Sequence, residues 1–285
     1  REGKKPVDAP TGGDKPITTT GTVLTIDSRP RDRRRPLPAA IIGTPSRRTY
    51  GNDTATVAIL SNDEITQLYR RIAPFYDALA AKGWLGVRRH RELAVRGLQL
   101  QPEDVVVDLC CGTGLNFALL HDAVGARGRI IGVDLSPDML DRARRRADRK
   151  GYDNVELVRA DVASYAFPPG VDSVISTYGL EMVPEYDDII RRAATALPGG
   201  ARLSVYGLKH PDHWPRAVLK LAILAAKPFG VSREYESFRP YESVRRHLLE
   251  ADYREFLKGA AYLSVGERSS ESDPGDSRPS EAKEP

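Results

Sequence analysis

Apolar and polar positions follow two different rhythms between Asp104 and residue 208. Short, nearly continuous apolar runs recur, and such runs are typical of strands buried on both faces of a sheet. We expect strands at 105–109, 129–134, 154–160, 171–177 and 201–207. The segments between them have apolar residues at helical spacing and predict helices near 115–124, 137–150 and 186–197. This alternation, with short connections, predicts a doubly wound α/β sheet.

The chain before this region divides into a polar arm and a helical cap. Residues 1–60 are rich in Pro and Arg and lack a sustained apolar period, which predicts a disordered arm. Ser61 and Glu64 fit a capping box, so we expect a helix from about residue 63. A second helix is expected near 79–98. Its polar side is predicted to carry four arginines, Arg88, Arg89, Arg91 and Arg96.

The pattern changes again after residue 208. Residues 209–242 contain several prolines around an apolar helix, and we expect them to form a lid or insert. A helix and two strands then complete a domain that spans residues 61–266; they are expected near 242–250, 253–257 and 260–265. Residues 267–285 are rich in Ser, Glu, Asp and Pro and predict a disordered acidic tail.

Composition agrees with a globular body that carries polar appendages. Hydrophobic residues make up 40% of the 285 residues, yet the mean hydropathy is −0.42. The net charge of +4 is modest and does not by itself indicate a nucleic-acid partner. Adjacent cysteines such as Cys110 and Cys111 rarely form a disulfide and make a poor metal site, so we expect a cytoplasmic protein without a metal. No apolar run approaches the roughly 20 residues that span a bilayer, and no signal-peptide core is expected.

The most informative segment is the turn Val107-Asp108-x-Cys110-x-Gly112-x-Gly114. Gly112 and Gly114 lack a side chain, so the backbone there can adopt positive φ and approach a ligand closely. The helix expected after them directs its free N–H groups to the same place. The second predicted strand ends in an acid, Asp134. A strand, a glycine loop, a helix and an acid-tipped strand together predict a site for a nucleoside-containing cofactor.

The acidic residues discriminate between cofactors. A dinucleotide brings an anionic pyrophosphate to this loop, and its fingerprint has Gly or Ala where this chain has Phe117. Asp108 would repel a pyrophosphate, whereas S-adenosylmethionine carries a sulfonium and an ammonium group. Asp134 is placed for the ribose hydroxyls, and Asp161, at the next strand tip, for the adenine amino group. S-adenosylmethionine is therefore the predicted cofactor, although an aspartate like Asp161 can also serve a turn alone.

Four segments resemble the class I S-adenosylmethionine-dependent methyltransferases, and among them the ubiquinone/menaquinone C-methyltransferase group. These segments are Tyr69-x-x-x-Ala73-x-x-Tyr76-Asp77, Val107-Asp108-x-Cys110-x-Gly112-x-Gly114, Gly132-Val133-Asp134-x-Ser136-x-x-Met139-Leu140 and Ala160-Asp161. The resemblance covers residues 62–266. It implies a Rossmann-like sheet of seven strands with an antiparallel last strand, a helical N-terminal cap and a lid.

The resemblance also implies a cofactor-binding set. The glycines line the methionine part, Asp134 holds the ribose, and Asp161 with Val162 meets the adenine. Tyr76 covers the cofactor from the N-terminal cap. The complete predicted set is Tyr76, Asp108, Cys110, Gly112, Gly114, Asp134, Leu135, Ser136, Met139, Asp161, Val162 and Thr177.

The chain departs from the family pattern at two positions. Cys110 stands where the loop usually has its first glycine; it is small enough to be accepted, and methyl transfer from a sulfonium requires no nucleophilic thiol. Asp77 is followed by Ala78, where the quinone enzymes have asparagine, a departure that weakens the inference of a quinone substrate.

The acceptor has to be inferred from the segments after the fourth and fifth strands. A quinol or phenol needs a base, and the candidates are Tyr178, Glu181 and His210. The lid segment 214–227 is mostly apolar with a few basic residues, which favours a lipophilic acceptor and peripheral contact with an anionic membrane, at its inner face. We therefore expect methyl transfer to a small lipophilic quinol or related phenol.

Three alternatives remain. A phospholipid N-methyltransferase of the phosphatidylethanolamine type would also suit a greasy lid. A nucleic-acid methyltransferase would suit the arginine-rich arm, but residues 176–179 lack the Asn/Asp-Pro-Pro-Tyr/Phe motif of enzymes that methylate base amino groups. A non-catalytic cofactor-binding module is less consistent with the intact acids. The oligomeric state stays open.

Overall fold

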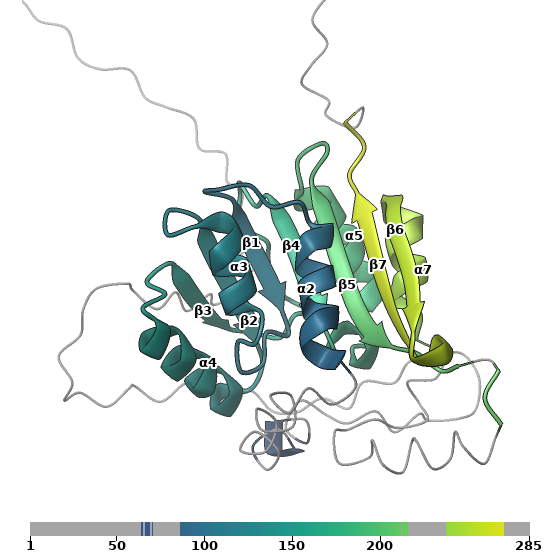
Figure 1. Cartoon of the computed structure of the whole chain (residues 1–285), viewed down its shortest axis with the longest axis horizontal. Coiled ribbons are helices and arrows are strands. Elements are labelled where there is room, and N and C mark those ends of the chain that lie inside the picture. Colours follow the sequence, from purple (N-terminus) through teal and green to yellow (C-terminus); the bar gives the residue numbers. More distant parts are fainter. Residues whose placement is uncertain are drawn as a thin grey trace, which may run out of the picture.

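A seven-stranded mixed sheet carries the other elements of the chain (Figure 1). The structure is a computed structural model that describes residues 64, 66–68, 70, 86–211, 213–215 and 238–270. Its strands are β1 (Val105–Leu109), β2 (Arg129–Asp134), β3 (Val155–Arg159), β4 (Ser173–Thr177), β5 (Arg202–Leu208), β6 (Leu249–Phe256) and β7 (Ala261–Glu267). They lie in the order β3-β2-β1-β4-β5-β7-β6; the first five are parallel, and β7 runs antiparallel to β5 and β6. The predicted Rossmann-like sheet with an antiparallel last strand is confirmed.

Helices cover both faces of this sheet (Figure 1). One face carries α2 (Val87–Gly97), α3 (Phe117–Val124) and α4 (Pro137–Lys150), and the other carries α5 (Tyr186–Ala196) and α7 (Pro240–His247). Two short 3-10 turns, η2 (Leu180–Met182) and η5 (Leu257–Gly259), follow β4 and β6. Val106 faces the first group of helices and Val107 the second, each fully buried. Burial on both faces explains why the central strands are continuous apolar runs.

Local signals place the helix after β2 with high accuracy. Ser136 is the N-cap of α4, and its hydroxyl accepts the Met139 N–H at 3.4 Å. Pro137 occupies the first turn, and Gly151 ends the helix with φ 69. A serine cap, an early proline and a terminal glycine in the left-handed region are standard helix boundaries, so α4 spans the predicted residues 137–150.

Several predicted boundaries are wrong; the strand expected at 171–177, for example, begins at Ser173. The helix expected at 242–250 is α7, which ends at His247, and Leu249 already begins β6. The charged sequence of β6 is not a strand pattern, but its backbone pairs with β7, and this pairing decides its conformation. The helix expected from residue 115 begins instead at Phe117, because Leu115 and Asn116 belong to the turn after the glycine loop.

The prediction for Arg91 is also wrong. It was expected on the polar side of its helix with Arg88, Arg89 and Arg96, but its side chain is buried, with 6% exposure. The buried residues of α2 are His90, Arg91, Ala94 and Val95. Arg91 therefore lies on the apolar stripe of α2, where it packs against the sheet.

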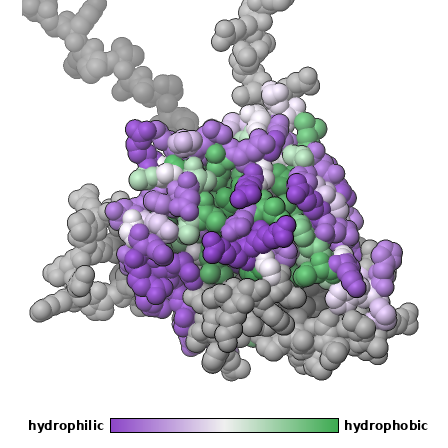
Figure 2. Space-filling view, viewed as in Figure 1, coloured by the Kyte–Doolittle hydropathy of each residue, from purple (hydrophilic) through white to green (hydrophobic). Residues whose placement is uncertain are grey.

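Several predictions lie outside the described residues. These include the arm at 1–60, most of the insert at 209–242, Tyr76 and most of the tail at 267–285. Residues 64, 66–68 and 70 are helical, in agreement with the helix expected from residue 63. Among the described residues, no helix is long and apolar enough to cross a membrane. Figure 2 shows the face covered by α2, α3 and α4, where hydrophilic residues lie along the helices and hydrophobic residues appear between them.

Candidate functional site

The predicted site residues gather at one edge of the sheet because β1 to β4 are parallel. In register, Leu109 lies beside Val133 of β2 and Ser176 of β4, and Asp134 lies beside Arg159 of β3. The glycine loop thus lies between the tip of β2 and the tip of β4. Such an edge, where the loops after successive strands meet, is the usual ligand site of open α/β sheets.

The glycine loop leaves room for a ligand. Cys110, Gly112 and Gly114 all have positive φ, of 54, 56 and 76. A Cβ built on Gly112 would meet no atom of the described residues within 4 Å, so none of these residues covers its backbone on that side. A ligand can therefore approach the peptide groups of this loop closely.

The Phe117 ring fills the space beside two glycines that have no side chain there, Gly114 of the loop and Gly132 of β2. A Cβ on Gly114 would lie 2.4 Å from the Phe117 ring, and a Cβ on Gly132 of β2 would lie 2.9 Å from it. Phe117 is fully buried. A bulky residue is accepted at this point of the helix because glycines face it from the loop and from β2.

Asp134 braces the loop from the tip of β2. Its Oδ2 accepts the Gly112 N–H at 2.8 Å, and its Oδ1 accepts the Ser136 N–H at 2.9 Å. Burial raises the pKa of Asp134, while these backbone donors lower it. Its carboxylate therefore ties the tip of β2 to the glycine loop, and carboxylate oxygens have further lone pairs with which to accept ribose hydroxyls.

The neighbours of Asp134 contribute mainly through their backbone. Ser136 caps α4, and Met139 is 2% exposed, so both side chains are buried. Leu135 is partly exposed between them.

A buried polar network lies beneath the loop. Asn116 donates to Asp108 Oδ1 at 3.0 Å and to Thr177 Oγ1 at 3.1 Å. The Arg91 guanidinium donates to Asn116 Oδ1 at 2.9 Å and to Thr177 Oγ1. Because Asp108 and Thr177 are 0% and 4% exposed, these two predicted cofactor residues support the loop from inside the protein.

Burial raises the pKa of Asp108 to about 7, and the Asn116 hydrogen bond and the Arg91 charge oppose this rise. Its Oδ2 has no hydrogen-bond partner among the described residues. Neither Arg91 nor Asn116 was predicted from sequence. The apolar spacing of Ala94 and Val95, extended back by one turn, reaches Arg91 and could have revealed it.

Tyr178 begins the segment after β4 in a left-handed conformation, with φ 60. Its ring lies 4.9 Å from the Tyr206 ring and under the Arg91 guanidinium at 5.2 Å. Its hydroxyl lies 3.5 Å from His90 Nδ1. A bulky residue with positive φ is uncommon and is found mostly where surrounding contacts hold it, often at functional sites.

Glu181, in η2, is a buried carboxyl group at the same edge. Burial raises its pKa to about 7, although backbone N–H groups oppose the rise. Its Oε1 accepts the Leu208 N–H at 3.3 Å, and its Oε2 has no partner among the described residues. A Cβ on Gly207 would lie 3.0 Å from this Oε2 and 2.9 Å from the Tyr262 hydroxyl, so both groups pack closely against this glycine and a larger residue there would crowd them.

The predicted acids converge on Cys110. Burial raises the pKa of the Cys110 thiol, and Asp134, Glu181, Asp108 and Asp161 raise it further. A raised pKa keeps this thiol protonated, and the protonated thiol is a poor nucleophile. This agrees with the expectation that Cys110 is a small loop residue and not a catalytic thiol. Among the described residues, no cluster of ligands suits a metal ion.

Asp161 lies in the turn after β3, where its Oδ1 accepts the Ala163 N–H at 2.9 Å. Val162 is buried in the core beside α5 and can reach a ligand only through its backbone. After β5, His210 is partly exposed, and Trp214 donates to the Lys258 carbonyl at 3.1 Å.

Comparisons with known proteins identify the family. A methyltransferase-domain profile matches residues 106–200. The chain is 34% identical over 161 residues to a 2-phytyl-1,4-naphtoquinone methyltransferase of Synechococcus elongatus, covering 54% of this chain and 68% of that protein. The enzyme of the same name from Thermosynechococcus vestitus is 30% identical, with 62% of this chain and 81% of that protein covered. The chain belongs to the class I S-adenosylmethionine-dependent methyltransferases.

The fold of this methyltransferase agrees with solved structures. An O-methyltransferase family protein from Burkholderia thailandensis aligns with a TM-score of 0.53 at 21% identity, over 69% of this chain and 59% of that chain. The cofactor of this methyltransferase is S-adenosylmethionine. The open backbone at Gly112 and the carboxylates around the loop fit a cofactor that is cationic and carries no phosphate.

Proposed function

We propose that this methyltransferase acts on a small lipophilic quinol or related phenol. The observation that carries the proposal is the buried carboxyl group of Glu181, whose Oε2 has no partner in the described part of the chain and whose pKa is raised to about 7 by burial. A phenolic hydroxyl must lose its proton for the ring to become a strong nucleophile, and a carboxylate with a raised pKa is a suitable base. The names of the two cyanobacterial relatives support the same acceptor class.

S-adenosylmethionine, when bound, would supply a sulfonium methyl group, and S-adenosylhomocysteine would leave as the methyl is transferred in line to the acceptor. The residues of this chain then have to align the two molecules and exclude water. We propose that Glu181 takes the acceptor proton, that Tyr178 contacts the acceptor ring, and that His210 lies at the outer side of the acceptor site. The Tyr206 ring and the Arg91 guanidinium hold the Tyr178 ring in place, which suits a residue that positions the acceptor.

For the cofactor, we propose the roles expected from the sequence. The loop residues Cys110, Gly112 and Gly114 receive the methionine part, and Asp134 receives the ribose while it braces Gly112. The adenine lies at the Asp161 turn. Asp108 and Thr177 act from beneath the loop, where the network with Arg91 holds them.

An assay of S-adenosylhomocysteine release tests the acceptor. The panel contains a prenylated naphthoquinol, phosphatidylethanolamine and a small phenol lacking the prenyl chain. We expect turnover with the quinol, weaker turnover with the phenol and none with the phospholipid. Turnover with phosphatidylethanolamine alone would overturn the proposal in favour of a phospholipid N-methyltransferase.

We also propose peripheral contact with an anionic membrane, because prenylated acceptors reside in bilayers. Two exposed arginines on α4, Arg144 and Arg145, support such a contact. Liposome co-sedimentation at increasing phosphatidylglycerol content tests this, with and without residues 213–229. Absence of binding at every composition would contradict membrane contact while leaving the acceptor assay unaffected.

A further inference from the structure

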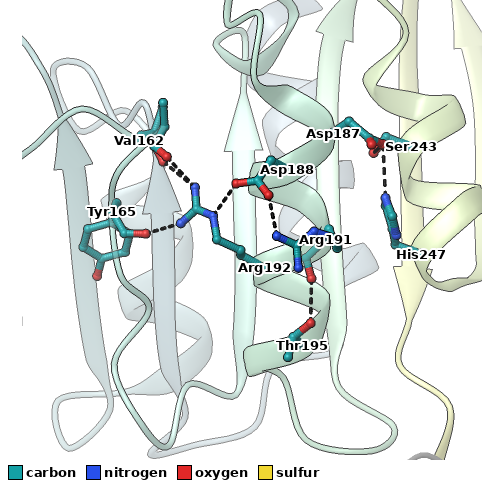
Figure 3. Close-up of polar contacts among 10 residues, drawn as sticks. Val162, Tyr165, Asp187, Asp188, Arg191, Arg192, Thr195, Ser243 and His247 are labelled. Carbon is teal, nitrogen blue, oxygen red and sulfur yellow. Dashed lines mark hydrogen bonds and ion pairs between the residues drawn. The ribbon is translucent and has the colours of Figure 1, made fainter. Parts of the chain in front are cut away.

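One arginine of α5 gathers the turn that carries Asp161 (Figure 3). Arg192 donates from Nη2 to the Val162 carbonyl at 3.2 Å and to the Ala163 carbonyl at 2.8 Å. Its Nη1 donates to the Tyr165 carbonyl. Three carbonyl groups of one turn thus converge on a single guanidinium.

The guanidinium is itself held in place. Arg192 Nε donates to Asp188 Oδ2 at 2.8 Å, one helical turn earlier in α5. The side chain is only 25% exposed, whereas the neighbouring Arg191 is 53% exposed and also bonds Asp188. Figure 3 shows Arg192 directed toward Val162 and Tyr165, while Arg191 points away from that turn.

A single peptide group links Arg192 to Asp161. The carbonyl of Val162 accepts from Arg192, and the N–H of the same planar peptide belongs to Ala163. In a trans peptide the N–H points away from the carbonyl. That N–H is the donor to Asp161 Oδ1, at 2.9 Å. The orientation of this peptide therefore couples the guanidinium on one side to the carboxylate on the other.

We propose that Arg192 is a positioning residue. Through the Val162–Ala163 peptide it orients the Asp161 carboxylate so that this carboxylate can accept a hydrogen bond from the adenine amino group of the cofactor. Without the guanidinium, the Val162 carbonyl keeps only the Tyr165 N–H, at 3.4 Å, and the Ala163 and Tyr165 carbonyls lose the Arg192 donor. The Val162–Ala163 peptide is then held less firmly, and the Ala163 N–H is no longer fixed on Asp161. The proposal rests on the proposed contact between Asp161 and adenine. A lysine has a single ammonium in place of the planar fork and cannot bridge Asp188 and three carbonyls in the same way.

Calorimetric binding of two probes tests the proposal without any acceptor. The probes are S-adenosylhomocysteine and S-inosylhomocysteine, in which an oxo group replaces the adenine amino group. In Arg192→Gln we expect affinity for S-adenosylhomocysteine to fall about 10-fold, the loss expected for hydrogen bonds made by a charged group. The preference for the adenine probe should fall with it. Arg192→Lys should recover little of the affinity for S-adenosylhomocysteine and little of the preference for it over S-inosylhomocysteine. The matched control Arg191→Gln should retain the wild-type affinity and preference.

The outcomes distinguish a failure of the Asp161–adenine contact from a failure of the role of Arg192. Equal binding of both probes by the wild-type protein would overturn the Asp161–adenine contact itself. A wild-type preference that survives in Arg192→Gln and Arg192→Lys would overturn the role of Arg192 alone. In an Asp161→Asn background, Arg192→Gln should no longer change the preference, because both residues act on one contact. Thermal unfolding of each variant identifies a loss of folded protein, which would lower binding of both probes equally.

Discussion

The polar groups at the ends of β2 and β3 have different hydrogen-bond partners from those beside the ends of β4 and β5. At the tips of β2 and β3, Asp134 and Asp161 accept backbone N–H groups from the loops that they hold. Beside the ends of β4 and β5, Glu181 Oε2 of η2 and the Tyr262 hydroxyl of β7 are buried without a partner among the described residues. Partnered carboxylates favour a rigid loop, whereas a buried carboxyl with a free oxygen favours proton exchange. Asp108 Oδ2, beneath the glycine loop, is likewise buried without a partner among the described residues, so the contrast holds between the strand-tip acids Asp134 and Asp161 and Glu181. As proposed above, the first half receives the cofactor and the second half the acceptor; they are called the cofactor half and the acceptor half.

The sharpest test removes the proton acceptor of the second half. Glu181→Gln should lower kcat roughly 10²- to 10⁴-fold, the range for loss of a general base, while S-adenosylhomocysteine binding stays unchanged. Because the base must be ionised, wild-type kcat should rise with pH through about 7. The exposed Glu242→Gln on α7 is the control. A kcat similar to that of the control would show that Glu181 does not accept the proton.

Stability against pH tests the same carboxyl without turnover. Its pKa is raised from 4.5 to about 7, so the folded state binds the proton more tightly than the unfolded state. The stability that this provides is complete below about pH 4.5 and is lost as pH rises through 7. Relative to Glu181→Gln, the wild-type protein should therefore lose roughly 3 kcal/mol between pH 4.5 and 8. Urea unfolding of both proteins measures the difference, and parallel pH curves would contradict it.

A third test addresses the network beneath the cofactor loop. Arg91→Leu removes the donor to Asn116 and Thr177 and the positive charge near Asp108. We expect a loss of about 2 kcal/mol in the free energy of unfolding at pH 7, as for hydrogen bonds of a charged group. The exposed neighbour Arg89→Leu is the control. Equal unfolding midpoints in urea would show that Arg91 does not support the loop.

The smallest expected effect concerns the brace of the cofactor half. Asp134→Ala removes the acceptor for the Gly112 and Ser136 N–H groups and the proposed ribose contact. We expect S-adenosylhomocysteine to bind about 10-fold more weakly by calorimetry, with kcat at saturating cofactor largely retained. Asp141→Ala, an exposed acid on α4, should bind normally. Unchanged affinity in Asp134→Ala would remove this residue from the cofactor site.

Local patterns predicted most of the sheet and much of the cofactor half. Apolar runs with glycine and acidic ends located β1 and β2, and a serine cap with a terminal glycine located both ends of α4. These features depend on residues close together in the chain. The sequence of β6 failed as a predictor because its conformation depends on pairing with β7.

Long-range contacts account for the residues that sequence reasoning missed or misplaced. Arg91 reads as one of several surface arginines, yet it is buried against Asn116 and Thr177, which lie far along the chain. In the sequence, Arg192 likewise has the pattern of an ordinary surface charge on an amphipathic helix. Only the folded structure places it against the carbonyl groups of the turn after β3. Nothing in the local spacing distinguishes Arg192 from Arg191.

The sequence alone determined the fold class, the cofactor and the reaction, because strand periodicity, glycine conformations and the acid at each strand tip are local properties. Only the tertiary structure decided which charges are buried and what they bond. Burial depends on elements brought together from distant parts of the chain, and it raises the pKa of the Asp108 and Glu181 carboxyl groups. The tertiary structure also distinguished Asp134 and Asp161, whose carboxylates accept backbone N–H groups, from Asp108 and Glu181, each of which has one buried oxygen without a partner among the described residues.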